Sequence, residues 1–150
     1  MKLAEALIER KDLQSRLSRL NQRLQANALV QEGDTPLEDP RSLIKMVEAT
    51  IEELSILIDR INKTNAATLI DGKSLSEMIT RRDLMIRRIS IMREFLEKAS
   101  SKVDRYSRNE IIITSTVDVK PYQKMVDELS HETRLLDAKI QYTNWNTELM

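Results

Sequence analysis

Residues 75–103 of the chain read LSEMITRRDLMIRRISIMREFLEKASSKV, and their apolar residues recur at alternating steps of three and four. This nearly heptad spacing is typical of a helix that packs lengthwise against another helix. One slot of the repeat holds Arg82 instead of an apolar residue. The apolar positions are Leu75, Met78, Met85, Ile89, Met92, Leu96, Ala99 and Val103. The stretch therefore predicts a long helix with one buried stripe, in which the methionines serve packing rather than a cofactor.

The same spacing recurs in the other parts of the chain. The first piece has Leu3, Ala6, Leu13, Leu17, Leu20 and Leu24, with Arg10 in one slot. The second piece has Val47, Ile51, Leu54, Ile58 and Ile61, and reaches Asn65. The last piece would turn Tyr122, Met125, Leu129, Leu136 and Ile140 inward. We therefore predict a mainly α fold, built from long antiparallel helical hairpins or a bundle with coiled-coil-like seams, plus one short β element.

Helix breakers and caps place the boundaries of these pieces. Asp39 before Pro40 is an N-cap with proline at the first helical position, and Ser74 with Glu77 fits a capping box. Gly72 and Pro121 mark two further interruptions. We predict one helical domain over residues 1–150. Its helices would cover about 2–30, 40–66, 74–103 and 119–147.

One segment predicts a strand. Residues 110–117 read EIIITSTV and are β-branched almost throughout, which favours extended backbone over helix. A lone strand leaves its main-chain groups unpaired, so it needs a partner. The candidates are Thr68, Leu69 and Ile70, or the same strand of another subunit.

The composition excludes several classes of site and partner. Without cysteine the chain has no disulfide or thiolate, and a single histidine, His131, leaves no multi-histidine metal centre, so we expect no metal and no cofactor. The balance of 24 basic and 24 acidic residues argues against nucleic-acid binding. Glu5 and Glu9 interrupt any signal peptide, and no apolar run is long enough to span a membrane. We expect a cytoplasmic homo-oligomer, because the long stripes exceed what one copy can cover.

Charge is unevenly distributed along the chain. Residues 32–59 hold eight acidic and two basic side chains, whereas residues 81–93 hold five arginines and one aspartate. The simplest interpretation is an antiparallel hairpin of the second and third helices with complementary flanks. The alternative is an arginine face that binds RNA, which the lack of stacking aromatic residues disfavours.

Neutral polar residues gather where the second and fourth helices are predicted to end. They are Asn62, Thr64, Asn65 and Thr68 in one group, and Asn144, Asn146 and Thr147 in the other. In an up-and-down bundle the two groups would share one pole, where they could bind a neutral polar ligand or simply cap helices and fix register. Tyr106 and Arg108 carry donors for an anion, although a structural turn is the simpler interpretation. His131 beside Glu128 and Glu132 could hold a metal, but a solvated histidine is simpler.

Five segments together resemble a known family. They are residues 1–10 (MKLAEALIER), 60–65 (RINKTN), 106–111 (YSRNEI), 116–119 (TVDV) and 144–149 (NWNTEL). In combination they resemble the septicolysin-like family of small uncharacterised bacterial proteins over essentially the whole chain. The resemblance implies no catalytic mechanism or catalytic residue, and the family name implies a pore-forming cytolysin. Three functions follow as hypotheses: an oligomeric interaction or scaffold protein, a ligand-binding protein or enzyme with the polar site, and a cytolysin.

Overall fold

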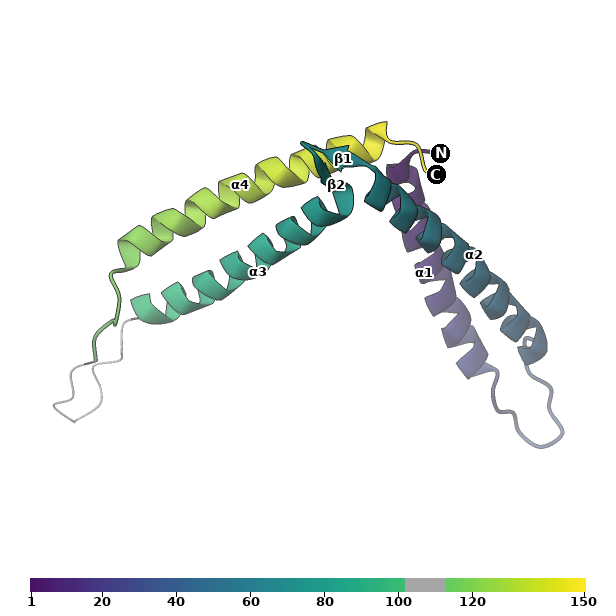
Figure 1. Cartoon of the computed structure of the whole chain (residues 1–150). Coiled ribbons are helices and arrows are strands. Elements are labelled where there is room, and N and C mark those ends of the chain that lie inside the picture. Colours follow the sequence, from purple (N-terminus) through teal and green to yellow (C-terminus); the bar gives the residue numbers. More distant parts are fainter. Residues whose placement is uncertain (102–112) are drawn as a thin grey trace, which may run out of the picture. The chain divides into compact units, whose positions relative to one another are not determined.

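The computed structural model describes residues 1–101 and 113–150 of the chain. The fold is mainly α, with four helices packed as hairpins and one small antiparallel sheet (Figure 1). The elements are α1 (Leu3–Ala26), α2 (Pro40–Ala67), β1 (Leu69–Ile70), β2 (Lys73–Ser74), α3 (Leu75–Ser100) and α4 (Val119–Asn146). The predicted fold class is confirmed.

The helices belong to two compact units. The first unit contains Met1–Ser76 and Gln141–Met150, and the second contains Glu77–Ile140. The sequence predicted a single helical domain over all 150 residues.

The seam between α1 and α2 forms the core of the first unit. The row Leu3, Ala6 and Leu20 of α1 is buried, which confirms the register predicted for the first helix. On α2 the buried row is Leu43, Thr50, Leu57, Ile61 and Thr64. The sequence placed Ile51 and Asn65 in this row, but Ile51 is 50% exposed and Asn65 only half-buried. That part of the predicted seam is therefore wrong by one residue.

Two threonines explain the misplaced seam of α2. The hydroxyl of Thr50 donates to the carbonyl of Met46 at 2.7 Å, and that of Thr64 donates to the carbonyl of Arg60 at 2.8 Å. Each hydroxyl is thus satisfied within its own helix and can be buried among apolar side chains. A search for apolar spacing passes over such residues.

Helix α1 ends at Ala26, four residues before the predicted end, because Asn27 turns the chain. The amide of Asn27 donates to the carbonyl of Arg23 at 2.9 Å and accepts from the main-chain N–H of Glu38 at 3.0 Å. The same glutamate pairs with the Arg23 guanidinium. The end of α1 and the start of α2 are therefore fastened together across the loop.

The short sheet is a hairpin that follows α2 directly. Its turn holds Asp71 and Gly72 at φ 50° and 80°, the conformation that two-residue hairpin turns require. The strand predicted over 110–117 is not found in its described part, since 113–117 contain no strand, and 110–112 lie outside the described residues. Ser115 Oγ instead donates to the carbonyl of Val117 at 2.9 Å, a local turn that competes with strand pairing.

Main-chain pairing joins the first and last residues of the first unit. The N–H of Leu3 donates to the carbonyl of Thr147 at 2.8 Å, and the N–H of Leu149 donates to the carbonyl of Met1 at 2.9 Å. The carboxylate of Glu148 lies 2.7 Å from Lys2 Nζ and 3.2 Å from the Met1 amino group. Hydrogen bonds from Lys2 and from that amino group hold the pKa of Glu148 below its ordinary value.

The core of the second unit lies between α3 and α4. Ile89 and Leu96 pack against Val126, with Met92, Val119 and Leu129 around them. The predicted register of α3 is confirmed from Leu75 to Ala99, while Val103 lies outside the described residues. The predicted register of α4 is wrong at Tyr122, which is 40% exposed. Val126 and Thr133 are buried instead, and the Thr133 hydroxyl donates to the carbonyl of Leu129 at 2.7 Å.

Helices pair within each of the two units. Helix α2 packs against α1, and α3 packs against α4, so ion pairs form within these hairpins. Arg82, in the missing slot of the α3 stripe, donates to Asp137 of α4 at 2.8 Å and to Asp83 at 2.8 Å. Burial lowers the pKa of the Arg82 guanidinium, but the hydrogen bonds and the negative charges of Asp137 and Asp83 together raise it above its ordinary value. The polar slot in the stripe is thus neutralised by the facing helix.

Candidate functional site

The polar residues predicted at the end of α2 have different environments. Asn62 is exposed, whereas Asn65 and Thr68 are half-buried. Thr68 ends the helix with its main chain, because its N–H donates to the carbonyl of Thr64 at 2.9 Å and its carbonyl accepts from Leu75 at 2.8 Å. This part of the predicted site therefore includes the cap of α2.

The two asparagines of α4 also differ from each other. Asn146 is exposed, and its Nδ2 donates to the carbonyl of Tyr142 at 2.7 Å. Asn144 is only 4% exposed, and its Oδ1 is buried without a hydrogen-bond partner among the described residues. An unpaired buried acceptor is unusual in a folded protein. Asn144 therefore stands out within the predicted site.

The described hydrogen bonds do not join the α2 group of Asn62, Asn65 and Thr68 to Asn144 or Asn146. The segment after α4 instead reaches Thr64, which belongs to the predicted polar group of α2, and Arg60, which does not. The main-chain N–H of Met150 donates to Thr64 Oγ1 at 3.0 Å, and Arg60 Nε donates to the carbonyl of Met150 at 2.8 Å. Arg60 was not among the predicted site residues, although it lies one turn before Thr64.

The structure gives the other predicted residues no contact with these polar side chains. Tyr106 and Arg108, proposed for an anion, lie outside the described residues. His131 is exposed. Within residues 1–101 and 113–150, no three histidine, aspartate or glutamate side chains are placed to hold a metal ion together.

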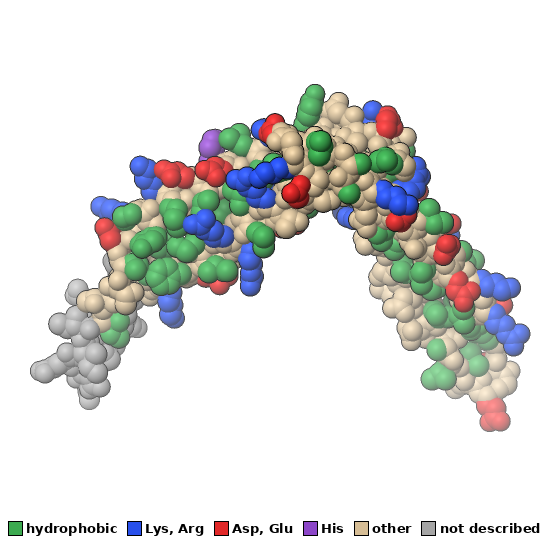
Figure 2. All heavy atoms as spheres, viewed as in Figure 1, with side chains coloured by type: hydrophobic (Ala, Val, Ile, Leu, Met, Phe, Trp, Pro, Cys, Tyr) green, Lys and Arg blue, Asp and Glu red, His purple; other side chains and the backbone are tan. Residues whose placement is uncertain are grey.

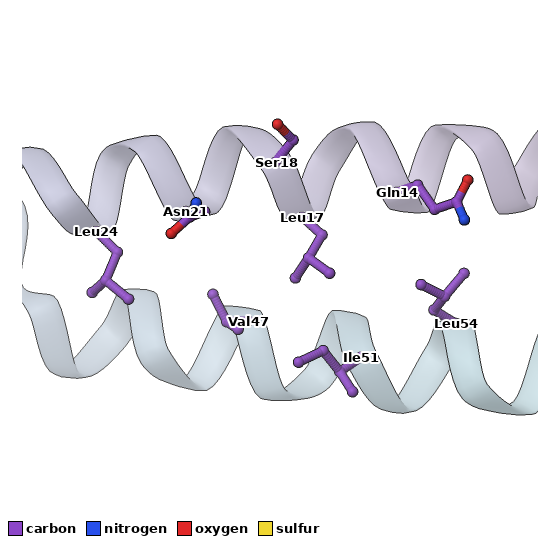
Figure 3. Close-up of a pocket in the computed structure, with 8 residues that line it drawn as sticks. All are labelled: Gln14, Leu17, Ser18, Asn21, Leu24, Val47, Ile51 and Leu54. Atoms are coloured by element: carbon purple, nitrogen blue, oxygen red, sulfur yellow. The ribbon is translucent and has the colours of Figure 1, made fainter.

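An apolar groove runs along one side of the α1–α2 seam, away from the predicted polar residues. Its volume is about 690 Å³. Its lining residues are Gln14, Leu17, Ser18, Asn21 and Leu24 of α1, and Val47, Ile51 and Leu54 of α2. Figure 3 shows Leu17 and Leu24 pointing toward α2, while Ser18 points away from it. The groove can accept apolar side chains, and its amides can donate and accept hydrogen bonds at the edge.

A second groove, in the other unit, has a different chemical character. It lies between α3 and α4 and has a volume of about 430 Å³. Arg93 and Arg134 line it together with Glu94 and Glu97, and an Arg93 Nη2 donates to Ser130 Oγ at 3.1 Å. Because both signs of charge are present, this groove has no marked preference for anions or cations.

Comparisons with known proteins agree with the fold and name no activity. The chain is similar to a functionally unknown conserved protein from Corynebacterium diphtheriae, known from its crystal structure, with 38% sequence identity and a TM-score of 0.93. The similarity covers 100% of this chain and 99% of that one. No curated protein matches the chain. Residues 10–149 match the model of a family of unknown function, DUF6847.

Proposed function

The chain belongs to the DUF6847 family of unknown function, and from this premise we propose that it is a cytoplasmic interaction protein that acts as a homo-oligomeric scaffold. The main support for this proposal is the large apolar surface that each two-helix hairpin leaves exposed within its own unit. A hairpin of two helices buries one stripe from each helix. Apolar residues beside that stripe remain available to a partner.

Exposed large apolar side chains occur in both hairpins. Figure 2 shows hydrophobic side chains gathered along α3 and α4, and a second set along α1 and α2. In α1 and α2 they include Ile44, Met46 and Ile51, which flank the seam on α2. In α3 and α4 they include Leu84, Ile86, Ile91, Phe95 and Leu135. Single exposed apolar residues are ordinary, but sets that continue a seam are typical of helix partners.

Sedimentation equilibrium tests the proposal. At micromolar concentration we expect a mass that is a multiple of 17.4 kDa. Because the driving force is apolar burial, the mass should persist at 0.5 M salt. A protein that sediments as a single copy at 100 μM would overturn the proposed function.

A second candidate is a ligand-binding protein or enzyme, which the orphaned carbonyl of Asn144 favours. A buried acceptor without a donor is suited to a ligand that brings an N–H or O–H group. The proposed site would comprise Asn62, Asn65, Thr68, Asn144 and Asn146, all of the first unit. Calorimetric titration with small amides and dipeptides tests it, since the parent should bind and Asn144→Leu should not.

A third candidate comes from the resemblance to the septicolysin-like family, whose name implies membrane pores. Among the described residues, none of the helices is both long enough and apolar enough to cross a bilayer. Release of a dye from phosphatidylcholine vesicles tests this activity directly. Release at micromolar protein would favour the cytolysin over the scaffold.

A further inference from the structure

The two sides of the α1–α2 seam differ in charge. In an antiparallel helix pair, the residues flanking the seam on one side of the first helix face those on the same side of the second. On one side, Arg16 Nη1 of α1 lies 3.8 Å from Glu53 Oε2 of α2. Charged residues flank the seam on that side, as is usual for a seam that faces water.

The other side of the seam carries no charge at the corresponding positions of either helix. We call these positions the neutral face. They recur every seven residues and are Leu7, Gln14 and Asn21 of α1, and Ile44, Ile51, Ile58 and Asn65 of α2. Ile44 is 45% exposed and Ile51 is 50% exposed. Several neutral-face residues also line the 690 Å³ groove, so the groove and the uncharged stripe are one surface.

A helix that packs against more than one other helix needs an uncharged flank of this kind. A two-helix seam requires apolar residues at only two positions of each heptad, whereas a bundle helix needs a third. The second helix supplies that third position with Ile44, Ile51 and Ile58. The α1–α2 hairpin thus has the apolar pattern of two helices of a four-helix bundle.

We propose that the neutral face binds the same face of a second copy, so that two α1–α2 hairpins form a four-helix bundle. This inference rests on the proposed function and assigns its contact surface. Hairpins packed face to face would enclose the exposed isoleucines between four helices. The amides of Gln14 and Asn21 would lie within the interface and fix its register, as single polar residues do in coiled coils.

Charge complementarity selects a second copy and its orientation. Residues 10–23 of α1 contain five basic side chains and one acidic one, whereas residues 48–59 of α2 contain four acidic and no basic side chains. A two-fold axis along the bundle places each α1 beside the α2 of the other copy, so unlike charges meet. An axis across the bundle would instead place the two basic helices side by side. The charges therefore favour the first arrangement.

A pair of isoleucine variants tests this interface. Ile51→Glu places a charge on the neutral face, and Ile56→Glu is the matched control, because Ile56 lies on the same helix and is 55% exposed. Five residues separate them, so Ile56 points about 140° away around the helix. We expect Ile51→Glu to weaken self-association about 100-fold, because each dimer would bury two unpaired carboxylates. Ile56→Glu should associate as the parent does.

A second variant guards against loss of folding in the first. Asn21→Glu adds a charge to an exposed neutral-face position without removing any apolar contact within the hairpin. Circular dichroism shows whether each variant keeps its helices, and sedimentation equilibrium gives its mass. A folded, dissociated Asn21→Glu supports the interface even where Ile51→Glu does not fold.

The possible outcomes separate the inference from the proposed function. An oligomeric parent whose mass is unchanged in both Ile51→Glu and Asn21→Glu would overturn the neutral face as the interface, while the scaffold function would stand. Equal dissociation by Ile56→Glu and Ile51→Glu would overturn it too, because the effect would not belong to one face. A monomeric parent would overturn both proposals.

Discussion

Replacing Asn144 with leucine should stabilise the protein. Its side chain is 4% exposed, and the carbonyl oxygen Oδ1 has no donor among the described residues. A buried polar atom without a partner costs about 1 to 3 kcal/mol of folding free energy. Leucine has the same branched shape and no polar atom, so Asn144→Leu should recover about that amount. For a chain of this length, the melting temperature should rise by roughly 3 to 9 °C.

The neighbouring asparagine provides the control for this prediction. Asn146 lies two residues further along the same helix but is exposed. Its Nδ2 donates to the carbonyl of Tyr142, which water can also satisfy. Asn146→Leu should therefore change the stability by no more than about 0.5 kcal/mol.

Calorimetric melting and urea unfolding of both variants beside the parent give the comparison. Asn144→Asp supplies an opposite perturbation, because it replaces the amide nitrogen with a second acceptor and should lower the melting temperature. A lower melting temperature for Asn144→Leu, together with a neutral Asn146→Leu, would refute the reasoning. The Oδ1 atom would then have a stabilising partner, and the argument for the ligand-site candidate would lose its observation.

Three further predictions concern stability. Asp137→Ala should lower the free energy of unfolding by about 1 kcal/mol in urea, because Arg82 would keep only one carboxylate partner in a half-buried slot. The pKa of Glu148 is lower in the folded chain than in the unfolded chain. Its contribution to folding stability is therefore fully present above the ordinary glutamate pKa and is lost as the pH falls through the pKa of the folded state. Glu148→Gln should reduce the fall in melting temperature at acid pH. Thr50→Val should leave the melting temperature unchanged or higher, because the Met46 carbonyl keeps its main-chain bond; a fall of several degrees would contradict the packing described for α2.

Apolar spacing alone was enough to predict the helices and the seam residues of α1 and α3. It failed on α2 and α4, where Thr50, Thr64 and Thr133 occupy buried positions with their hydroxyls satisfied inside the helix. Such residues look polar in a sequence, although they pack like valine. The early end of α1 at Asn27 depends on a contact with Glu38, eleven residues away, which local spacing cannot reveal.

Within each unit, apolar burial decides which helices pack, because exposed ion pairs contribute little. The hairpin of the second and third helices that complementary charges favour stays a prediction. The candidate site was predicted only as residue types. Composition drew attention to the asparagines, but only the structure distinguishes the buried Asn144 from the exposed Asn62 and Asn146. The uncharged positions of the neutral face, by contrast, can be read from the sequence once the seam is known.

Spin labelling on the groove tests the central claim most directly, because the chain has no cysteine of its own. Ser18→Cys carries a label beside the neutral face, where the side chain is exposed. Neighbouring helices in a bundle lie 8–10 Å apart, so two copies joined through this face should place their labels within about 30 Å of each other. A pulsed dipolar measurement should show that separation, and it should disappear on dilution with unlabelled protein. An oligomeric sample without any dipolar coupling between the labels would contradict the account.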